Sequence, residues 1–349
     1  MTIKSLDGLR GIAVLFVVLS HMSLERINLL SALDFSGAGK MGVYLFFSLS
    51  AFLLTWQALN TDNSIPRNQM YWAGYFLRRM LRIYPLYFIA LFVSLMMTNL
   101  IPGYTPRITS PSDLFEHLLL QKGTSIYWAI PVEFCYYLVL PIVVFALQFA
   151  RRAHQLGPLS LAVVAVIVSS IAWPSSETPA NSVQLGPYLS IFLLGSLIAS
   201  IVTSELIRDQ SKRNHLLSIT GFFALIIALM TVPAFWREAI DPTISNRAFH
   251  KDFLLYGLLW GVCILAAVKG ARYFTALFEW TPIRFMGRIS FSIYLWHYPV
   301  IQLVARDIAL QPWLQFLLVI TIALPLSWIS YRLIERPFIS WGHRKTNHW

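Results

Sequence analysis

Residues 4–24 read KSLDGLRGIAVLFVVLSHMSL, an apolar stretch long enough to cross a bilayer as one helix. Two ionisable residues, Arg10 and His21, interrupt it. Their separation is close to three turns of an α-helix, so both side chains fall on nearly the same face, roughly 16 Å apart along the axis. A charged side chain inside a membrane span costs about 2.5 kcal/mol or more unless it faces a cavity or a partner. The stretch therefore predicts a first transmembrane helix that forms one wall of a polar pathway.

The whole chain has the composition of a membrane protein. Of its 349 residues, 57% are hydrophobic and 12% are charged, whereas a soluble globular protein carries about 25% charged residues. Apolar stretches of the length that a bilayer-spanning helix needs occur at 6–24, 41–59, 83–101, 127–149, 158–174, 185–204, 216–235, 252–269, 289–308 and 312–333. We therefore expect an all-α, polytopic membrane protein with about ten transmembrane helices. The transmembrane domain would cover residues 1–340 and a short cytoplasmic tail residues 341–349, which leaves no room for a soluble catalytic domain.

The net charge of +11 at first suggests a nucleic-acid partner, but the distribution of the basic residues argues against one. Most of the 27 Lys and Arg residues fall in alternate loops on one side of the predicted spans. The positive-inside rule then places both termini in the cytoplasm. The two cysteines, Cys135 and Cys263, lie within spans, where we expect buried thiols rather than a disulfide framework.

Four further polar positions stand out within or beside the predicted spans. Arg78 and Arg82 are four residues apart, so they project from one face of a helix. Two guanidinium groups on one face can bind a phosphate bidentately, although interfacial anchoring to anionic lipid is the simpler interpretation. Glu133 lies about one and a half turns inside the fourth span, with His21 or an arginine as its expected partner. For His297, near the middle of the ninth span, we expect a structural role and a functional role equally.

Six motifs in the same order together resemble the acyltransferase family 3 of membrane O-acyltransferases, from Leu6 to Pro337. Each motif alone is weak, but six in order across the predicted spans are specific. The matching pieces are Asp7-Gly8-Leu9-Arg10-Gly11 with Arg10-x10-His21, Gly42 to Ser50, Arg78-x3-Arg82-Ile83-x-Pro85, Trp128 to Glu133, Ser290 to Pro299, and Ile334 to Pro337.

The resemblance implies an enzyme of a bacterial inner membrane. Members of this family take an acyl group, usually acetyl from acetyl-CoA at the cytoplasmic side, and pass it to a hydroxyl of an envelope or secreted glycan or of a small hydrophobic acceptor. The resemblance also implies that His21 is the catalytic imidazole and that Arg78 and Arg82 hold phosphates of CoA. Arg10 would guide the donor or orient the histidine. Because short single-domain members often act on O-antigen or a similar lipid-linked surface polysaccharide, that is the expected acceptor.

The chain departs from the family pattern at two places. Ala51 stands where a glycine is usual after Leu-Ser, which we expect to affect only helix packing. The segment Trp128-Ala129-Ile130-Pro131 replaces the commoner Trp-Ser-Leu-Ser, so two hydroxyls near Glu133 are missing.

The expected chemistry fits a neutral imidazole, which can take a hydroxyl proton and then protonate a departing thiolate near pH 7. We expect Glu133 to orient His21 and to stabilise its imidazolium form. Direct transfer from donor to acceptor is preferred slightly over a covalent acyl-enzyme. Residues that would serve as an acyl relay or line the cavity are Tyr44, Ser48, Tyr136, Tyr137, Tyr294 and His297.

The sequence gives less support to other functions. The H-x4-D, H-E-x-x-H and G-x-S-x-G motifs are absent, and the histidines and carboxylates lack the spacing of metal ligands. A transporter of an anionic or sugar-linked solute is compatible with buried His, Arg and Glu, but residues 1–174 and 185–333 show no convincing repeat. A non-catalytic scaffold would leave the cost of Arg10, His21 and Glu133 unexplained.

Overall fold

The computed structural model describes residues 3–30, 33–60, 69–204 and 211–346, and these residues form helices without any strand. The helices are α1 Lys4–Leu24, α2 Gly39–Asn60, α3 Gln69–Leu100, α4 Pro111–Leu118, α5 Ala129–Ala153, α6 Gly157–Ala172, α7 Leu189–Thr203, α8 Ser211–Met230, α9 Pro233–Ala239, α10 Phe253–Lys269, α11 Arg272–Glu279, α12 Thr281–Arg288, α13 Ser290–Asp307, α14 Pro312–Ser330 and α15 Arg336–Thr346. Short 3₁₀ turns cover Ser125–Trp128, Ser175–Glu177 and Gly186–Tyr188, and a π-helical turn, Tyr331–Glu335, joins α14 to α15.

Within the described residues, six helices are long and apolar enough to cross a membrane. The number rises to eight if two bent pairs each count as one span: α8 with α9, bent by 66°, and α10 with α11, bent by 101°. The chain is therefore an all-helical, multi-pass membrane protein. A helix covers most of each predicted stretch, but the count of ten and the cytoplasmic termini stay predictions. Arg67 and Arg208, which belong to the predicted basic side, lie outside the described residues.

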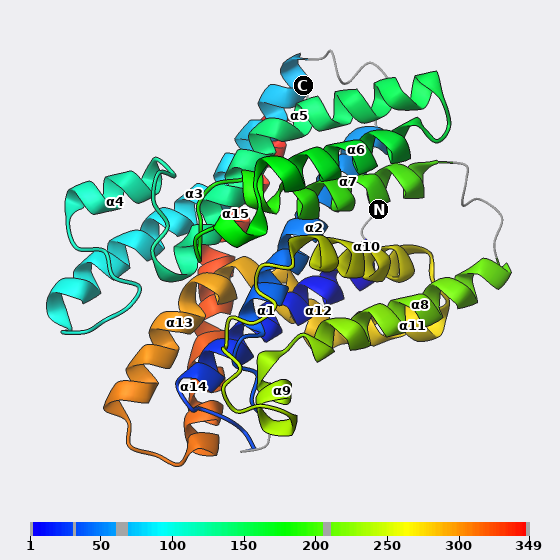
Figure 1. The fold of residues 1–349 in the computed structure, drawn as a ribbon. Coiled ribbons are helices and arrows are strands. Elements are labelled where there is room, and N and C mark those ends of the chain that lie inside the picture. Colours follow the sequence, from blue (N-terminus) through cyan, green and yellow to red (C-terminus); the bar gives the residue numbers. More distant parts are fainter. Residues whose placement is uncertain (1–2, 31–32, 61–68, 205–210, 347–349) are drawn as a thin grey trace.

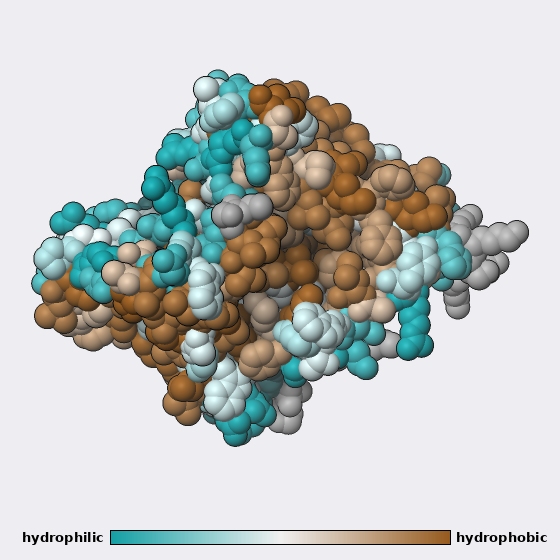
Figure 2. Space-filling view, turned by 90° about the horizontal axis from the view of Figure 1, so that it is seen from below, coloured by the Kyte–Doolittle hydropathy of each residue, from teal (hydrophilic) through white to brown (hydrophobic). Residues whose placement is uncertain are grey.

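The surface is apolar in the way that contact with lipid requires. Figure 2 shows one face on which hydrophobic residues form a broad area, with hydrophilic residues gathered at its edges. Large apolar side chains project outward from several helices, and Ile171 of α6 is 73% exposed. Such extensive apolar surface is unfavourable in water, so these helix faces are the ones that contact lipid.

Helix α1 occupies the centre of the molecule. In Figure 1 it lies in the middle of the view, with α5, α6 and α7 (green) above it and α13 and α14 (orange to red) below and to the left. It packs against α2, α10, α11, α12 and α13. The first predicted span is thus enclosed by other helices, as an ionisable helix face requires.

Glycines allow α1 to approach the α11–α12 segment closely. A Cβ atom added at Gly8 would lie 1.8 Å from the carbonyl oxygen of Phe278, and one added at Gly11 would lie 2.0 Å from that of Ile283. From the other side, a Cβ at Gly287 would lie 1.7 Å from the carbonyl oxygen of Asp7. Small residues of this kind let helix backbones touch in a membrane. The two glycines that flank Arg10 therefore fix its height against α12.

The C-terminal helix is part of the folded body. Helix α15 packs on α3, and a Cβ at Gly342 would lie 3.0 Å from the Leu81 side chain. The boundary expected at residue 340 falls inside this helix. The cysteines are free thiols, Cys263 buried and Cys135 partly buried, which agrees with their expected burial in spans.

We expect Gly287→Ala to destabilise the protein, because its new methyl group would collide with the Asp7 backbone. Overpacking of this kind costs about 1–3 kcal/mol. The thermal midpoint of the purified protein in detergent, followed by tryptophan fluorescence, would report the loss. The matched control is Gly261→Ala in α10, whose added methyl group meets only the flexible Ile198 side chain, at 3.3 Å. Equal midpoints for the two variants would contradict the packing argument.

Candidate functional site

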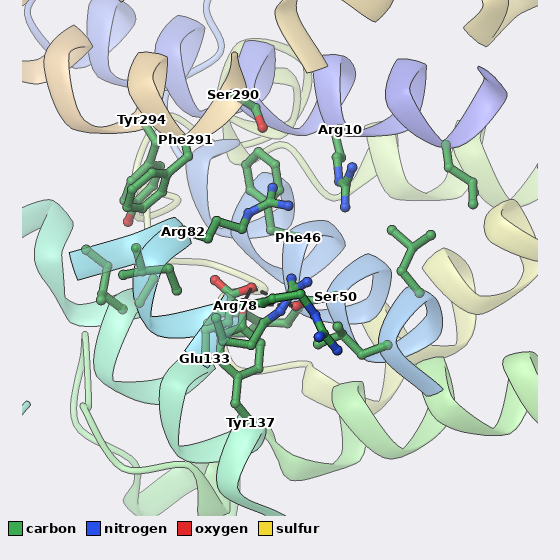
Figure 3. Close-up of a pocket in the computed structure, with 18 of the residues that line it drawn as sticks. Arg10, Phe46, Ser50, Arg78, Arg82, Glu133, Tyr137, Ser290, Phe291 and Tyr294 are labelled. Atoms are coloured by element: carbon green, nitrogen blue, oxygen red, sulfur yellow. Dashed lines mark hydrogen bonds between the residues drawn. The ribbon is translucent and has the colours of Figure 1, made fainter. Parts of the chain in front are cut away.

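A cavity of about 300 Å³ lies where α1, α2, α3, α5 and α13 converge. Figure 3 shows arginine side chains from α1 and α3 directed into this space, with a carboxylate from α5 beside them. Its polar lining residues include Asp7, Arg10, Ser50, Arg78, Arg79, Arg82, Glu133, Tyr137, Ser290, Tyr294 and His343. We call this space the arginine cavity.

The arginine cavity carries an excess of positive charge, because its lining includes four arginines and only two carboxylates. Arg10 lies 3.6 Å from the Asp7 carboxylate, and Arg78 donates a hydrogen bond to the Thr346 hydroxyl at 2.7 Å. Arg82 makes neither a hydrogen bond nor an ion pair within the described part of the chain. An unpaired guanidinium group facing a cavity is suited to bind a phosphate or another polyanion.

Glu133 is held in place inside this cavity by two hydroxyl groups. Its Oε1 atom accepts hydrogen bonds from Ser50 at 2.7 Å and from Tyr137 at 2.6 Å. Tyr137 lies one turn further along α5, and Ser50 comes from α2. The carboxylate therefore has a fixed position opposite the arginines.

His21 lies away from the arginine cavity and has a different partner from the one expected. Its Nδ1 atom is 2.9 Å from Nε2 of His297, and the two rings stack with centroids 5.1 Å apart. Tyr298 packs its edge against the His21 ring, at 4.9 Å between centroids. The expected orientation by Glu133 is therefore not what the described residues show. Glu133 shares the cavity with Arg10, and Arg10 lies three turns along α1 from His21.

Helix α13 connects the arginine cavity to the histidine pair. Ser290 and Tyr294 line the cavity, and the Tyr294 ring lies 6.0 Å from that of His297. The hydroxyl of Tyr294 donates to the carbonyl oxygen of Ile126, which fixes the ring. Spacings of four and three residues place these side chains on one helix face. This face of α13 therefore runs beside α1, from the cavity that contains Arg10 to the ring of His21.

Three other expected site residues lie outside the lining of the arginine cavity. Tyr44 donates to the carbonyl oxygen of His250 at 2.6 Å, and burial lowers the pKa of that loop histidine to about 4, so its ring is neutral. Tyr136 shares a hydrogen bond of 2.5 Å with Ser196. Ser48 is fully buried, and its hydroxyl has no partner among the described residues. These three side chains therefore take part in packing between helices: Tyr44 contacts the rings of Phe253 and Tyr256 in α10, and Tyr136 contacts α7 through Ser196.

Several cavity residues were not predicted from the sequence. Arg79 follows the predicted Arg78 directly, but its spacing gave no reason to single it out. His343 reaches the cavity only because α15 packs on α3. No group of three or more His, Cys, Asp or Glu side chains that could hold a metal occurs among the residues that the structure describes.

Comparison with known proteins gives a family and several relatives. A family model described as "Acyltransferase domain" matches residues 3–332. The chain is 25% identical to the peptidoglycan O-acetyltransferase OatA of Listeria monocytogenes, over 96% of this chain and 55% of that protein. It is 26% identical to a Bacillus subtilis protein named "Putative peptidoglycan O-acetyltransferase YrhL", over 98% of this chain and 56% of that protein. The chain thus spans about half the length of the curated relatives it matches. No solved structure matches it.

We expect the arginine cavity to bind inorganic pyrophosphate, a probe of its charge alone. Arg82→Gln should weaken binding about tenfold, the cost of one charged hydrogen bond. Glu133→Gln should bind equally well or more tightly, because it removes a negative charge and keeps an oxygen for Ser50 and Tyr137. Isothermal titration of the purified protein measures both effects. Arg306→Gln, at an exposed arginine paired with Asp307, is the matched control. If the Arg82→Gln and Arg306→Gln variants bound pyrophosphate with equal affinity, the cavity would not be the anion-binding site.

Proposed function

Because the chain belongs to the acyltransferase 3 family, we propose that it is a membrane O-acetyltransferase that transfers acetyl groups from acetyl-CoA to a hydroxyl of an envelope glycan. The family expected from the six sequence motifs is thereby confirmed. The proposal on the activity is carried by one observation: one face of α13 lines the arginine cavity with Ser290 and Tyr294 and then contributes His297 to the histidine pair, so it connects the two sites.

The arginine cavity is the proposed donor site. CoA carries a diphosphate and a 3′-phosphate, so it presents several anionic groups to the enzyme. Arg10, Arg78, Arg79 and Arg82 come from two helices and face one space, and a guanidinium group matches phosphate geometry through paired N–H donors. The pantetheine arm would then run along α13, past Tyr294, and bring the thioester to His21. The lipid-anchoring interpretation of Arg78 and Arg82 is less favourable, because both line the cavity.

The proposed reaction needs one base that becomes an acid. His21 takes the proton of the acceptor hydroxyl while the oxygen attacks the thioester carbonyl carbon, so that a C–O bond forms. The tetrahedral intermediate collapses with cleavage of the C–S bond. The thiolate of CoA then receives the proton from the His21 imidazolium, which returns the ring to its neutral form. The sum is one acetyl ester and one free thiol, with no covalent acyl-enzyme.

The proposed acceptor is a polysaccharide of the bacterial envelope. The relatives named above carry peptidoglycan in their names, which favours a peptidoglycan-type glycan. A lipid-linked O-antigen, the acceptor expected from the sequence, stays a prediction. The corresponding location is the inner membrane, with the arginine cavity open to cytoplasmic acetyl-CoA and both termini in the cytoplasm.

The proposed function is tested by transfer of radiolabelled acetyl from acetyl-CoA, in membranes that contain the protein and either peptidoglycan or lipid-linked O-antigen. Wild type should label one glycan fraction, and His21→Ala should lower the rate by about 100-fold or more, the usual contribution of a general base. His154→Ala, at an exposed histidine beyond the end of α5, is the control and should keep the wild-type rate. An active His21→Ala variant would exclude His21 as the base. Absence of label with every glycan, together with absence of acetyl-CoA binding, would favour the transporter.

The topology is tested by labelling single cysteines with a membrane-impermeant maleimide in cells, in a chain that carries Cys135→Ala and Cys263→Ala. Ser112→Cys lies in α4, which follows the C-terminal end of α3 in the chain, and Arg344→Cys lies in α15 next to His343 of the arginine cavity. We expect Ser112→Cys to react in intact cells and Arg344→Cys only after permeabilisation. Labelling of Arg344→Cys from outside would place the cavity away from cytoplasmic acetyl-CoA.

A further inference from the structure

The second histidine of the pair, His297, has no part in the reaction proposed above. It is fully buried in α13, whereas His21 is only partly buried. Its two ring nitrogens each have a polar contact: Nδ1 lies 3.0 Å from the carbonyl oxygen of Ile293, and Nε2 lies 2.9 Å from Nδ1 of His21. Both distances are those of hydrogen bonds between heavy atoms.

These two contacts define where the ring protons lie. A carbonyl oxygen can only accept, so Nδ1 of His297 carries a proton and donates it to Ile293. In a neutral imidazole the other nitrogen is then an acceptor, and a buried, unpaired imidazolium would be costly. Nε2 of His297 therefore accepts from His21, whose Nδ1 must carry a proton. It follows that Nε2 of His21 is the unprotonated nitrogen.

We propose that His297 is a positioning residue that holds His21 in the tautomer with a proton on Nδ1 and a lone pair on Nε2. The inference rests on the proposed role of His21 as the base. Without a fixed acceptor, a neutral imidazole divides its population between two tautomers and its ring is free to turn. With His297 in place, every neutral His21 ring presents Nε2 as the proton acceptor. The bond is kept through the reaction, because Nδ1–H remains a donor when Nε2 gains a proton.

The surroundings of the pair support a fixed ring rather than a loose contact. The Tyr298 ring packs on His21 with centroids 4.9 Å apart, and the Tyr294 ring lies 6.0 Å from that of His297. The backbone anchor for the chain of hydrogen bonds, Ile293, lies one helical turn before His297. The arrangement contains the base and the orienting group of a catalytic triad, and the carbonyl oxygen of Ile293 holds the orienting group in place. Here the orienting group is a neutral imidazole instead of a carboxylate.

The first test reads the tautomer without using activity. Nitrogen NMR of protein labelled with ¹⁵N-histidine distinguishes protonated from unprotonated ring nitrogens, and His21→Ala assigns the His21 signals. We expect the wild-type His21 ring to show a protonated Nδ1 and an unprotonated Nε2. His297→Leu should shift the ring to a mixture of tautomers. A wild-type His21 ring with its proton on Nε2 would overturn the proposal, whether or not the protein transfers acetyl groups.

The second test compares two substitutions of His297 whose side chains differ in length. The amide of His297→Gln can take the position of Nε2 and accept from His21, whereas that of His297→Asn reaches only the position of Nδ1. With acetyl-CoA as donor and chitopentaose as acceptor probe, His297→Asn should lower kcat about 100-fold and leave the KM for acetyl-CoA within about twofold. His297→Gln should keep kcat within about tenfold of wild type.

Equal kcat for the Asn and Gln variants, with both folded by thermal midpoint, would show a merely structural role and overturn the proposal. A wild-type protein that shows the expected tautomer but transfers no acetyl to chitopentaose, peptidoglycan or O-antigen would refute the proposed function. The assignment of His297 as the group that orients His21 would stand in that case.

Discussion

An ionisable side chain within a bilayer must face a cavity or a partner, and this constraint shapes the whole molecule. Helix α1 carries both Arg10 and His21, so its polar face has to be covered along three turns. The fold meets this requirement by placing α1 at the centre, with α2, α12 and α13 against it. The arginine cavity and the histidine pair are the two ends of the same covered face.

Close packing of backbones makes this covering possible. Gly8 and Gly11 on one side, and Gly287 on the other, bring α1 against the α11–α12 segment with carbonyl oxygens at the positions that side chains would otherwise take. Because this contact leaves no space for a Cβ, the position of Arg10 is set by backbone rather than by flexible side chains. The glycines of the first motif therefore position the arginine that lies between them.

The sequence predicts the parts of the site that lie close together along one helix. The face shared by Arg10 and His21 follows from helical spacing, as does the pair Arg78 and Arg82, and the structure brings the three arginines to one cavity. The partner of His21 could not be predicted in this way. Glu133 was the expected partner because it carries a negative charge. In the structure, however, Glu133 lies in the same cavity as Arg10, and it accepts hydrogen bonds from Ser50 and Tyr137. Helix heights across a bundle depend on packing between helices, which hydropathy does not encode.

The histidine pair also explains why a neutral partner suits His21 better than the expected carboxylate. In the proposed mechanism, a carboxylate beside His21 would repel both the thiolate that leaves the donor and the phosphates of the donor. In the arrangement found here, the negative charge of Glu133 stays among four arginines, while His297 contributes only an acceptor lone pair at 2.9 Å. In the proposed mechanism, the two ends of the covered face thus separate two tasks: holding the phosphates of the donor, and moving a proton.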